Sequence, residues 1–246
     1  RETDILLKAF ERITRGKCEL MLIAGYSGVG KTALVHQVHK PMTEKRAYFS
    51  AGKFDQYKRD IPYSAISLAF NEFCHYMLME DSETLKGRRE NILDAVGSNG
   101  QIIIDVIADL ELVIGRQPAV ASVGLVEAQN RFNLIFHNFI KAVCAQEHPF
   151  VLFIDDLQWA DSASLKLLKG LMLDDTIKYM LIIGAYRDNE VQRGHPFIEA
   201  VDEVRKSGAT VSTIELDNLQ QGDIKQLLSD SLLSNKQQVT ALSELI

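Results

Sequence analysis

The sequence predicts an α/β fold in which a mainly parallel β-sheet carries helices on both faces, as a three-layer sandwich. Short apolar runs typical of buried strands alternate along the chain with segments of helical periodicity. The first apolar run ends in a glycine-rich turn that leads directly into a helix. Between the second and third strand candidates lies a long, mostly helical stretch, which predicts an added helical segment beside the sheet.

The strand candidates are short runs in which apolar residues predominate. The first, residues 19–24, ends at Gly25 and has the pattern of a strand buried on both faces of a parallel sheet. Residues 210–216 alternate between apolar and polar side chains, which fits a last strand. The remaining candidates are residues 46–50, 149–154 and 179–183.

Helical spacing of apolar residues accounts for most of the remaining chain. An amphipathic helix is predicted at residues 3–14, and a second helix opens at Ala33 and is closed by Pro41. Residues 62–145 are predicted to be mostly helical, with the polar segment 81–90 as a solvated face. Two apolar stripes in this stretch are expected to pack in the core: Ile103, Ile107, Leu110 and Ile114 in one, and Phe132, Ile135, Phe136 and Phe139 in the other.

Composition and charge are those of an ordinary globular protein. Of the 246 residues 46% are apolar, and the net charge of −6 argues against a dedicated nucleic-acid binder, which usually presents a basic face. No apolar run approaches the ~18 residues that a membrane-spanning helix needs, and we expect no signal peptide at the polar start. Cys18, Cys74 and Cys144 are widely spaced in apolar contexts, so we expect reduced core thiols in a cytoplasmic protein. The chain opens without Met and stops inside a helical pattern, so we expect a piece of a longer polypeptide.

Residues 25–32, Gly-Tyr-Ser-Gly-Val-Gly-Lys-Thr, match the phosphate-binding pattern G-x-x-x-x-G-K-[ST] in full. The motif lies after a buried strand and before a helix, as it must, which argues against a chance match on a glycine turn. Its glycines let the backbone approach phosphate closely, and its N–H groups point at the anion where a helix begins. Lys31 would reach the β- and γ-phosphates of ATP, and the Thr32 hydroxyl would ligate Mg²⁺. The sequence therefore predicts a P-loop nucleoside triphosphatase whose ATP or ADP is held by Gly25, Ser27, Gly28, Val29, Gly30, Lys31, Thr32 and Ala33.

Two acids follow the strand candidate at residues 149–154, where a phosphoryl-transfer site needs a carboxylate near the metal. Asp155 is expected to hold Mg²⁺, mainly through water, and Asp156 to orient or deprotonate the attacking water. The alternative is an acid pair that only caps a loop. Asp161 is expected to have a structural role, as the N-cap of a helix over residues 162–172.

Arg187 follows the next strand candidate, at the same edge of the predicted sheet. There its guanidinium would face the γ-phosphate and sense its presence, and a surface salt bridge is the alternative interpretation. His36 and His39 share a helix face, but no acidic or thiol partner suggests a metal. Both histidines are therefore expected to be surface or packing residues.

Residues 153–161, Phe-Ile-Asp-Asp-Leu-Gln-Trp-Ala-Asp, resemble the second nucleotide motif of the STAND class of AAA-related ATPases. Supporting stretches are residues 52–56, 127–132 and 186–191, and the resemblance covers nearly the whole chain. The group it resembles most is the ATPase module of large bacterial sensor proteins, located between a serine/threonine kinase domain and a sensor histidine kinase.

The resemblance implies an ATP-driven switch in which Asp155 and Asp156 serve the metal and the water. It also implies that Arg1 and Glu2, the tail of the family's Gly-Arg-Glu opening, lie near the adenine, although the glycine is missing here. Helical patterns from residue 220 onward resemble the start of a lid. The expected organisation is therefore a P-loop core over residues 1–216 and a truncated helical lid over residues 217–246.

The leading hypothesis is an ATPase that serves as a regulatory switch in a larger bacterial signal-transduction protein, with slow hydrolysis between ATP and ADP states. Its partners would be the kinase domains of the same chain. A nucleotide-gated scaffold with negligible hydrolysis is one alternative. A P-loop kinase for a small acceptor is another, although the Asp155–Asp156 pair favours water as the acceptor and no arginine-rich lid is evident. A ring-forming motor would need an arginine for a neighbour's site, for which Arg131 is the candidate.

Replacing Lys31 by alanine should abolish ATP binding or turnover while the fold persists. The lysine compensates phosphate charge and should contribute little to the core. Nucleotide titration and circular dichroism of Lys31→Ala check both halves of this expectation. ATP affinity and turnover equal to those of the parent protein would contradict the P-loop assignment.

Overall fold

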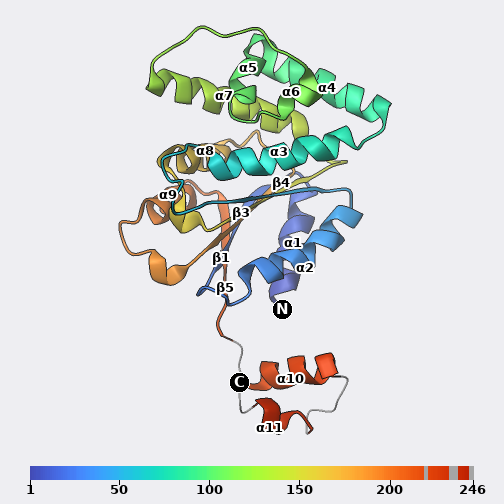
Figure 1. Ribbon diagram of the computed structural model, residues 1–246, viewed down its shortest axis with the longest axis vertical. Helices are drawn as coiled ribbons and strands as arrows, with labels where there is room; N and C mark the ends of the chain where they lie inside the picture. The colour runs from blue at the N-terminus through green and yellow to red at the C-terminus, as the bar shows by residue number, and fades with distance from the viewer. Residues whose placement is uncertain (219–220, 233–237, 244–246) are drawn as a thin grey trace.

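Five parallel strands form one sheet in the order β2-β3-β4-β1-β5 (Figure 1). The computed structural model describes residues 1–218, 221–232 and 238–243. Each strand coincides with or overlaps one of the predicted apolar runs, so the predicted parallel sheet is confirmed. The strands are β1 (Cys18–Ala24), β2 (Tyr48–Lys53), β3 (Phe150–Asp155), β4 (Met180–Tyr186) and β5 (Thr210–Glu215).

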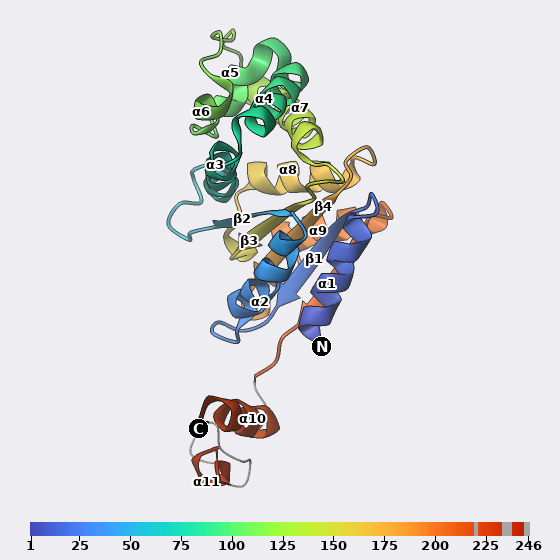
Figure 2. The same cartoon turned by 90° about the vertical axis from the view of Figure 1, so that its right-hand side faces the viewer.

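Helices cover both faces of this sheet, so the fold has three layers (Figure 2). Side chains of successive strand residues point to opposite faces. Met21, Ile23 and Phe153 contribute to a cluster with α1 and α2, whereas Leu20 and Leu22 contribute to a cluster with α3, α7, α8 and α9. The helices are α1 (Glu2–Ile13), α2 (Lys31–Glu44), α3 (Ser64–Leu78), α4 (Ser82–Val96), α5 (Gly100–Ile104), α6 (Leu110–Ile114), α7 (Leu125–Val143), α8 (Ser162–Leu173), α9 (Pro196–Lys206), α10 (Gln221–Leu232) and α11 (Thr240–Ser243), with short 3₁₀ turns η1 (Gly97–Asn99), η2 (Leu157–Trp159) and η3 (Asp188–Glu190).

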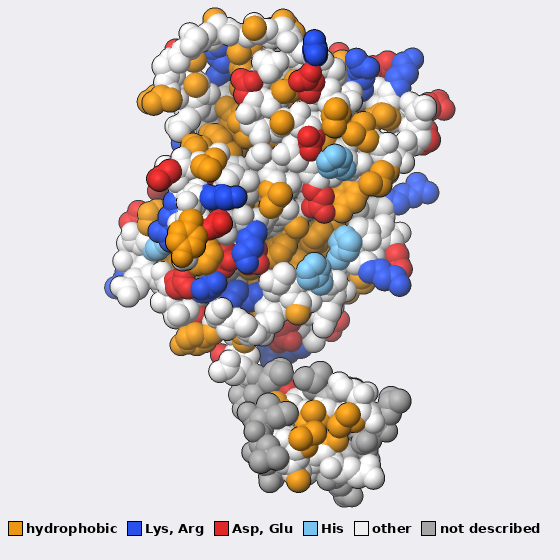
Figure 3. Space-filling model, in the orientation of Figure 1, with side chains coloured by type: hydrophobic (Ala, Val, Ile, Leu, Met, Phe, Trp, Pro, Cys, Tyr) orange, Lys and Arg blue, Asp and Glu red, His pale blue; other side chains and the backbone are white. Residues whose placement is uncertain are grey.

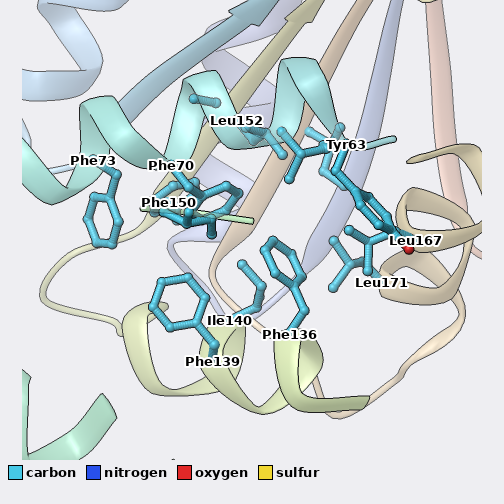
Figure 4. Close-up of a cluster of buried hydrophobic side chains, with 14 of the residues drawn as sticks. Tyr63, Phe70, Phe73, Phe136, Phe139, Ile140, Phe150, Leu152, Leu167 and Leu171 are labelled. Carbon is cyan, nitrogen blue, oxygen red and sulfur yellow. The ribbon is translucent and has the colours of Figure 1, made fainter. Parts of the chain in front are cut away.

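The predicted helical segment between β2 and β3 consists of α3 to α7, and aromatic rings join it to the sheet (Figure 4). Phe70 on α3 stacks on Phe150 at the start of β3, with ring centroids 5.3 Å apart, and meets Phe136 of α7 edge-on at 5.1 Å. The predicted stripe at residues 132–139 is confirmed, since all four side chains are buried on α7. The stripe at residues 103–114 is buried too, but a turn divides it between α5 and α6.

Two local predictions need correction. α2 does not end at Pro41, which lies in its last turns, and the helix continues to Glu44. A proline there removes one backbone donor near the helix end, and the Thr43 hydroxyl adds a bond to the His39 carbonyl at 3.1 Å. The second strand begins at Tyr48 because Arg46 has the left-handed φ of 62°, which a strand cannot include.

Residues 81–90 are mainly exposed, as predicted, and Arg88 is the notable exception. The Arg88 side chain is only 13% exposed, and its Nε donates to a Glu80 carboxylate oxygen at 2.8 Å. The same guanidinium lies over the Tyr48 ring, whose hydroxyl donates to Glu80. Arg88 therefore ties α4 to the start of β2.

The last helices, α10 and α11, lie apart from the sheet, beyond the end of β5 (Figures 1 and 2). The helical prediction for residues 220–246 falls partly outside the described residues, at 220, 233–237 and 244–246. None of the described helices combines the length and apolarity that crossing a membrane requires. Acidic and basic side chains are interspersed on the face seen in Figure 3.

β2 and α3 approach each other at Gly52 more closely than any side chain would allow. A Cβ placed on Gly52 would lie 2.0 Å from the carbonyl oxygen of Ala65, which is backbone and cannot rotate away. Gly87, by contrast, lies in α4 with no atom within 4 Å of the equivalent position. The two glycines therefore form a matched pair for testing this contact.

Gly52→Ala should destabilise the protein by about 1–3 kcal/mol because it forces β2 and α3 apart. Gly87→Ala should stabilise it by about 0.5–1 kcal/mol, since alanine costs less conformational entropy than glycine in a helix. Urea unfolding of both variants measures the two changes. Equal stability of the two variants would show that the close approach at Gly52 does not exist in solution.

Candidate functional site

A cavity of about 220 Å³ lies at the carboxyl edge of the sheet, where parallel strands bring their ends together. The loop after β1, the end of β2, the end of β3 and the residue after β4 all reach it. The cavity is lined by Ser27, Gly28, Gly30, Lys31, Thr32, Ala33, Lys53, Asp155, Asp156 and Arg187. Residues from four separate parts of the chain thus meet in one place.

The loop between β1 and α2 has the backbone geometry that its glycines were predicted to supply. Gly28 and Gly30 have φ of 80° and 101°, in the left-handed region that favours glycine. Gly30 is the residue before α2, so the first N–H groups of that helix face the cavity side of the loop. A Cβ on Gly25 would lie 2.6 Å from the Leu216 carbonyl oxygen, so this glycine allows the chain after β5 to pass close by.

Lys31 and Thr32 open α2 with their side chains engaged inside the site. The Lys31 ammonium donates to the carbonyl oxygens of Gly25 at 2.7 Å and Tyr26 at 2.8 Å, and the residue is 7% exposed. Burial lowers the pKa of Lys31, and this effect outweighs the nearby Asp155 carboxylate, which raises it. The Thr32 hydroxyl donates to Asp155 Oδ2 at 3.1 Å.

The predicted acid pair lies at the end of β3, and both carboxylates are buried. Asp156 has φ 56° and ψ 44°, a left-handed conformation uncommon for a residue other than glycine, and its N–H donates to Asp155 Oδ1 at 2.9 Å. Lys53 reaches the pair from the end of β2, with Nζ 3.1 Å from Asp156 Oδ2 and 4.0 Å from Asp155 Oδ2. Buried carboxylates need such partners, since an uncompensated charge in the interior is costly.

Arg187 lies at the rim, where it contacts several groups at once. Its Nε is 3.5 Å from Asp156 Oδ1, and one terminal nitrogen donates to Glu190 Oε1 at 2.6 Å. The guanidinium also lies over the Trp159 ring, 4.8 Å from its centroid. Arg187 thus lines the cavity and also forms a salt bridge with Glu190, and its role as a γ-phosphate sensor stays a prediction.

Sequence reasoning missed three residues that belong to this arrangement: Lys53, Gln158 and Trp159. The Gln158 side chain lies between Asp156 and the backbone N–H of Arg187. A signal for Lys53 existed, since it lies in the stretch 52–56 that supports the family resemblance, three residues after the predicted strand at 46–50. Gln158 and Trp159 lie within the stretch that carries the family resemblance, but their positions depend on the turn after β3, which periodicity does not predict.

Some expected residues lie elsewhere. Arg1 and Glu2 do not line the cavity, and the N-terminus lies at the same end of the core as the loop after β1 (Figures 1 and 2). Arg131 lies on α7, 3.1 Å from Glu127 Oε1, beside a different cavity. His39 packs edge-on against Phe49 at 4.6 Å between ring centroids, as a packing histidine should.

One structural expectation is met nearby. Asp161 caps α8, as predicted, by accepting a hydrogen bond from the Ser164 N–H at 2.8 Å. Its second carboxylate oxygen also accepts from the Tyr63 N–H at 3.2 Å, which links α8 to the start of α3. Cys74 and Cys144 are buried, whereas Cys18 is half-buried.

The fold and the site can be compared with known proteins. The family described as "AAA ATPase domain" matches residues 1–183, most of the chain. The chain belongs to this family. The AAA ATPase domain is also similar to the hybrid signal transduction histidine kinase G of Dictyostelium discoideum, with 37% identity over 172 residues. That match covers 70% of this chain and 5% of the relative, so the chain spans a small part of the relative's length.

Among solved structures, the AAA ATPase domain is similar to the crystal structure of Cdc6p from Pyrobaculum aerophilum. The TM-score is 0.50 at 13% sequence identity, and the match covers 93% of this chain and 47% of that chain. At this identity the similarity concerns the fold alone. It agrees with the three-layer architecture described above.

Proposed function

We propose that this AAA ATPase domain binds Mg-ATP in the cavity at the carboxyl edge of the sheet and hydrolyses it slowly, as a regulatory switch. The observation that carries the proposal is the convergence of Lys31 and Thr32 from the glycine loop with Asp155, Asp156 and Arg187 in one cavity. Each residue type matches a requirement of phosphoryl transfer to water. The family assignment supports the same chemistry.

Nucleotide binding is assigned to the loop after β1. Its backbone N–H groups and the first turn of α2 hold the phosphates, with contributions from Gly25, Ser27, Gly28, Val29, Gly30 and Ala33. Lys31 exchanges its two loop carbonyls for the β- and γ-phosphates. Arg1 and Glu2 are assigned to the adenine end, on the basis of the resemblance alone.

The metal site is assigned to Thr32 and Asp155. Their hydroxyl and carboxylate oxygens are neighbours at 3.1 Å, and hard oxygen donors of this kind suit Mg²⁺. The ion supplies charge neutralisation at the phosphates. Asp156 accepts the proton of the attacking water. Arg187 contacts the γ-phosphate after its guanidinium has moved away from Asp156 and Glu190.

The switch is assigned to a larger signal-transduction protein, in which other domains of the same chain read the nucleotide state. The similarity to a histidine kinase supports this setting. That relative comes from Dictyostelium discoideum, so it lends no support to a specifically bacterial origin. We assign the chain to the STAND class, place it in the cytoplasm, and divide it into a core at residues 1–216 and the beginning of a lid at 217–246.

A nucleotide-gated scaffold is the second candidate, and one contact favours it. The Lys53 ammonium lies 3.1 Å from Asp156 Oδ2, and a paired carboxylate is a weaker proton acceptor than a free one. If this ion pair persists with ATP bound, binding proceeds without hydrolysis. Steady-state turnover of the purified protein separates the two functions.

Asp156→Asn should separate ATP binding from hydrolysis. The amide keeps size and polarity but cannot accept a proton, so turnover should fall by about 10²–10⁴-fold with ATP affinity nearly unchanged. Phosphate release and calorimetric titration measure the two quantities. Asp155→Asn is the matched control, since it should weaken the magnesium dependence of binding. Parent-level turnover in Asp156→Asn would remove Asp156 from the water-activating role.

Arg187→Ala should weaken ATP binding and leave ADP affinity nearly unchanged. A charge-assisted contact of roughly 1.5–3 kcal/mol corresponds to about a ten- to hundredfold selective loss. Comparing the two dissociation constants by calorimetry tests this. An equal loss for both nucleotides would assign Arg187 to a structural salt bridge, and no loss for either would remove it from the site.

A further inference from the structure

Gln158 connects Asp156, the proposed water-activating residue, with Arg187, the proposed γ-phosphate sensor. Its side-chain amide donates from Nε2 to Asp156 Oδ1 at 2.9 Å. Its Oε1 accepts from the backbone N–H of Arg187 at 3.2 Å. The residue is 2% exposed, so both bonds form away from solvent.

The position of Gln158 follows from where the sheet ends. β3 and β4 are paired up to Ile154 and Gly184, and beyond that point the two backbones are no longer in register contact. The 3₁₀ turn η2 then directs the chain back, with the Trp159 N–H donating to the Asp156 carbonyl at 2.9 Å. This turn places the Gln158 amide where it replaces the missing backbone contact between the two strand ends.

The amide can serve this purpose because it offers one donor and one acceptor at its tip. A carboxylate on one side accepts and a backbone N–H on the other side donates, so the amide orientation is set by its two neighbours. Lys53 and Arg187 also reach Asp156, but their side chains are 60% and 25% exposed and approach from the rim. Gln158 holds the same carboxylate from the buried side, without charge.

We propose that Gln158 is a positioning residue that couples Arg187 to Asp156. It acts through two hydrogen bonds: one holds the Asp156 carboxylate in place, and the other ties that carboxylate to the backbone from which Arg187 extends. A displacement of the Arg187 backbone toward a γ-phosphate therefore reaches Asp156 through the Gln158 side chain, in addition to the direct contact of Arg187 Nε with Asp156 Oδ1 at 3.5 Å. This inference rests on the proposed function, in which Asp156 activates water and Arg187 senses the γ-phosphate.

The two hydrogen bonds of Gln158 form a bridge from Asp156 to Arg187, and two variants separate their contributions. Gln158→Glu keeps an acceptor for the Arg187 N–H but loses the donor and faces Asp156 with a second carboxylate. Gln158→Met has similar length and loses both groups. Gln192→Met, at an exposed position after η3, is the matched control. Turnover, KM for ATP and the ratio of ADP to ATP dissociation constants are measured for each, with circular dichroism as the check on folding.

Both variants should lower kcat by about tenfold or more, with KM for ATP within a few-fold, because part of the general-base contribution is lost. Gln158→Met should also reduce the preference for ATP over ADP, whereas Gln158→Glu should keep it. The control should match the parent protein in all three quantities. If Gln158→Met does not fold, Gln158→Asn takes its place, since its shorter chain cannot span both partners.

Parent-level kcat and ATP preference in Gln158→Met would overturn the coupling. An equal loss of affinity for ATP and ADP, with kcat unchanged, would overturn it as well and indicate a purely structural residue. Absence of turnover in the parent protein would contradict the proposed hydrolysis instead. In that case the ATP preference of Gln158→Met against the parent still tests the bridge, because it depends on Arg187 and not on water activation.

Discussion

The parallel register of β3 between β2 and β4 is the constraint on which the candidate site depends. Lys53 pairs with Asp155, so the last residues of the two strands emerge at the same height. Because strand side chains alternate, a slip of one residue would turn Asp155 to the other face of the sheet. The aromatic cluster around Phe70 and Phe150 opposes such a slip, since it fixes the start of β3 against α3 and α7.

Charge compensation is the second condition that the site meets. Two buried carboxylates lie beside three cationic side chains, and their partners come from β2, α2 and the end of β4. Buried charges are tolerated only when paired and hydrogen-bonded. A triphosphate entering the cavity would compete with Asp155 and Asp156 for the same cations. Binding of a polyanion here is therefore tied to rearrangement of pairs that already exist.

The sheet and most of the site follow from local sequence patterns, because each depends on a strong short-range signal. Apolar runs predict the strands. The positions of the glycines in residues 25–32 predict where the loop has positive φ. Asp155 and Arg187 are predicted to meet because parallel strands end at one edge. Lys53 was missed because the predicted strand stops at residue 50, whereas β2 continues to Lys53, where it pairs with Asp155 of β3.

Other differences arise where tertiary contacts decide. Arg88 belongs to a polar segment, but its contacts to Glu80 and the Tyr48 ring are made across two elements and cannot be inferred from spacing. A proline at the position of Pro41 is compatible with a helix that ends there and with one that continues for another turn. In the structure α2 continues to Glu44. A turn likewise divides residues 103–114 between α5 and α6. The apolar pattern does not reveal this turn, because every side chain of the stripe is buried, as it would be in one continuous helix.

The contact between Arg187 and Trp159 makes the site observable without any label. The chain contains one tryptophan, and its indole lies beneath a guanidinium at the rim of the cavity. When tryptophan is excited selectively over tyrosine, the emission therefore comes from a single place, whose local charge depends on where Arg187 is held. Tryptophan fluorescence is thus an optical readout of the position of the Arg187 side chain.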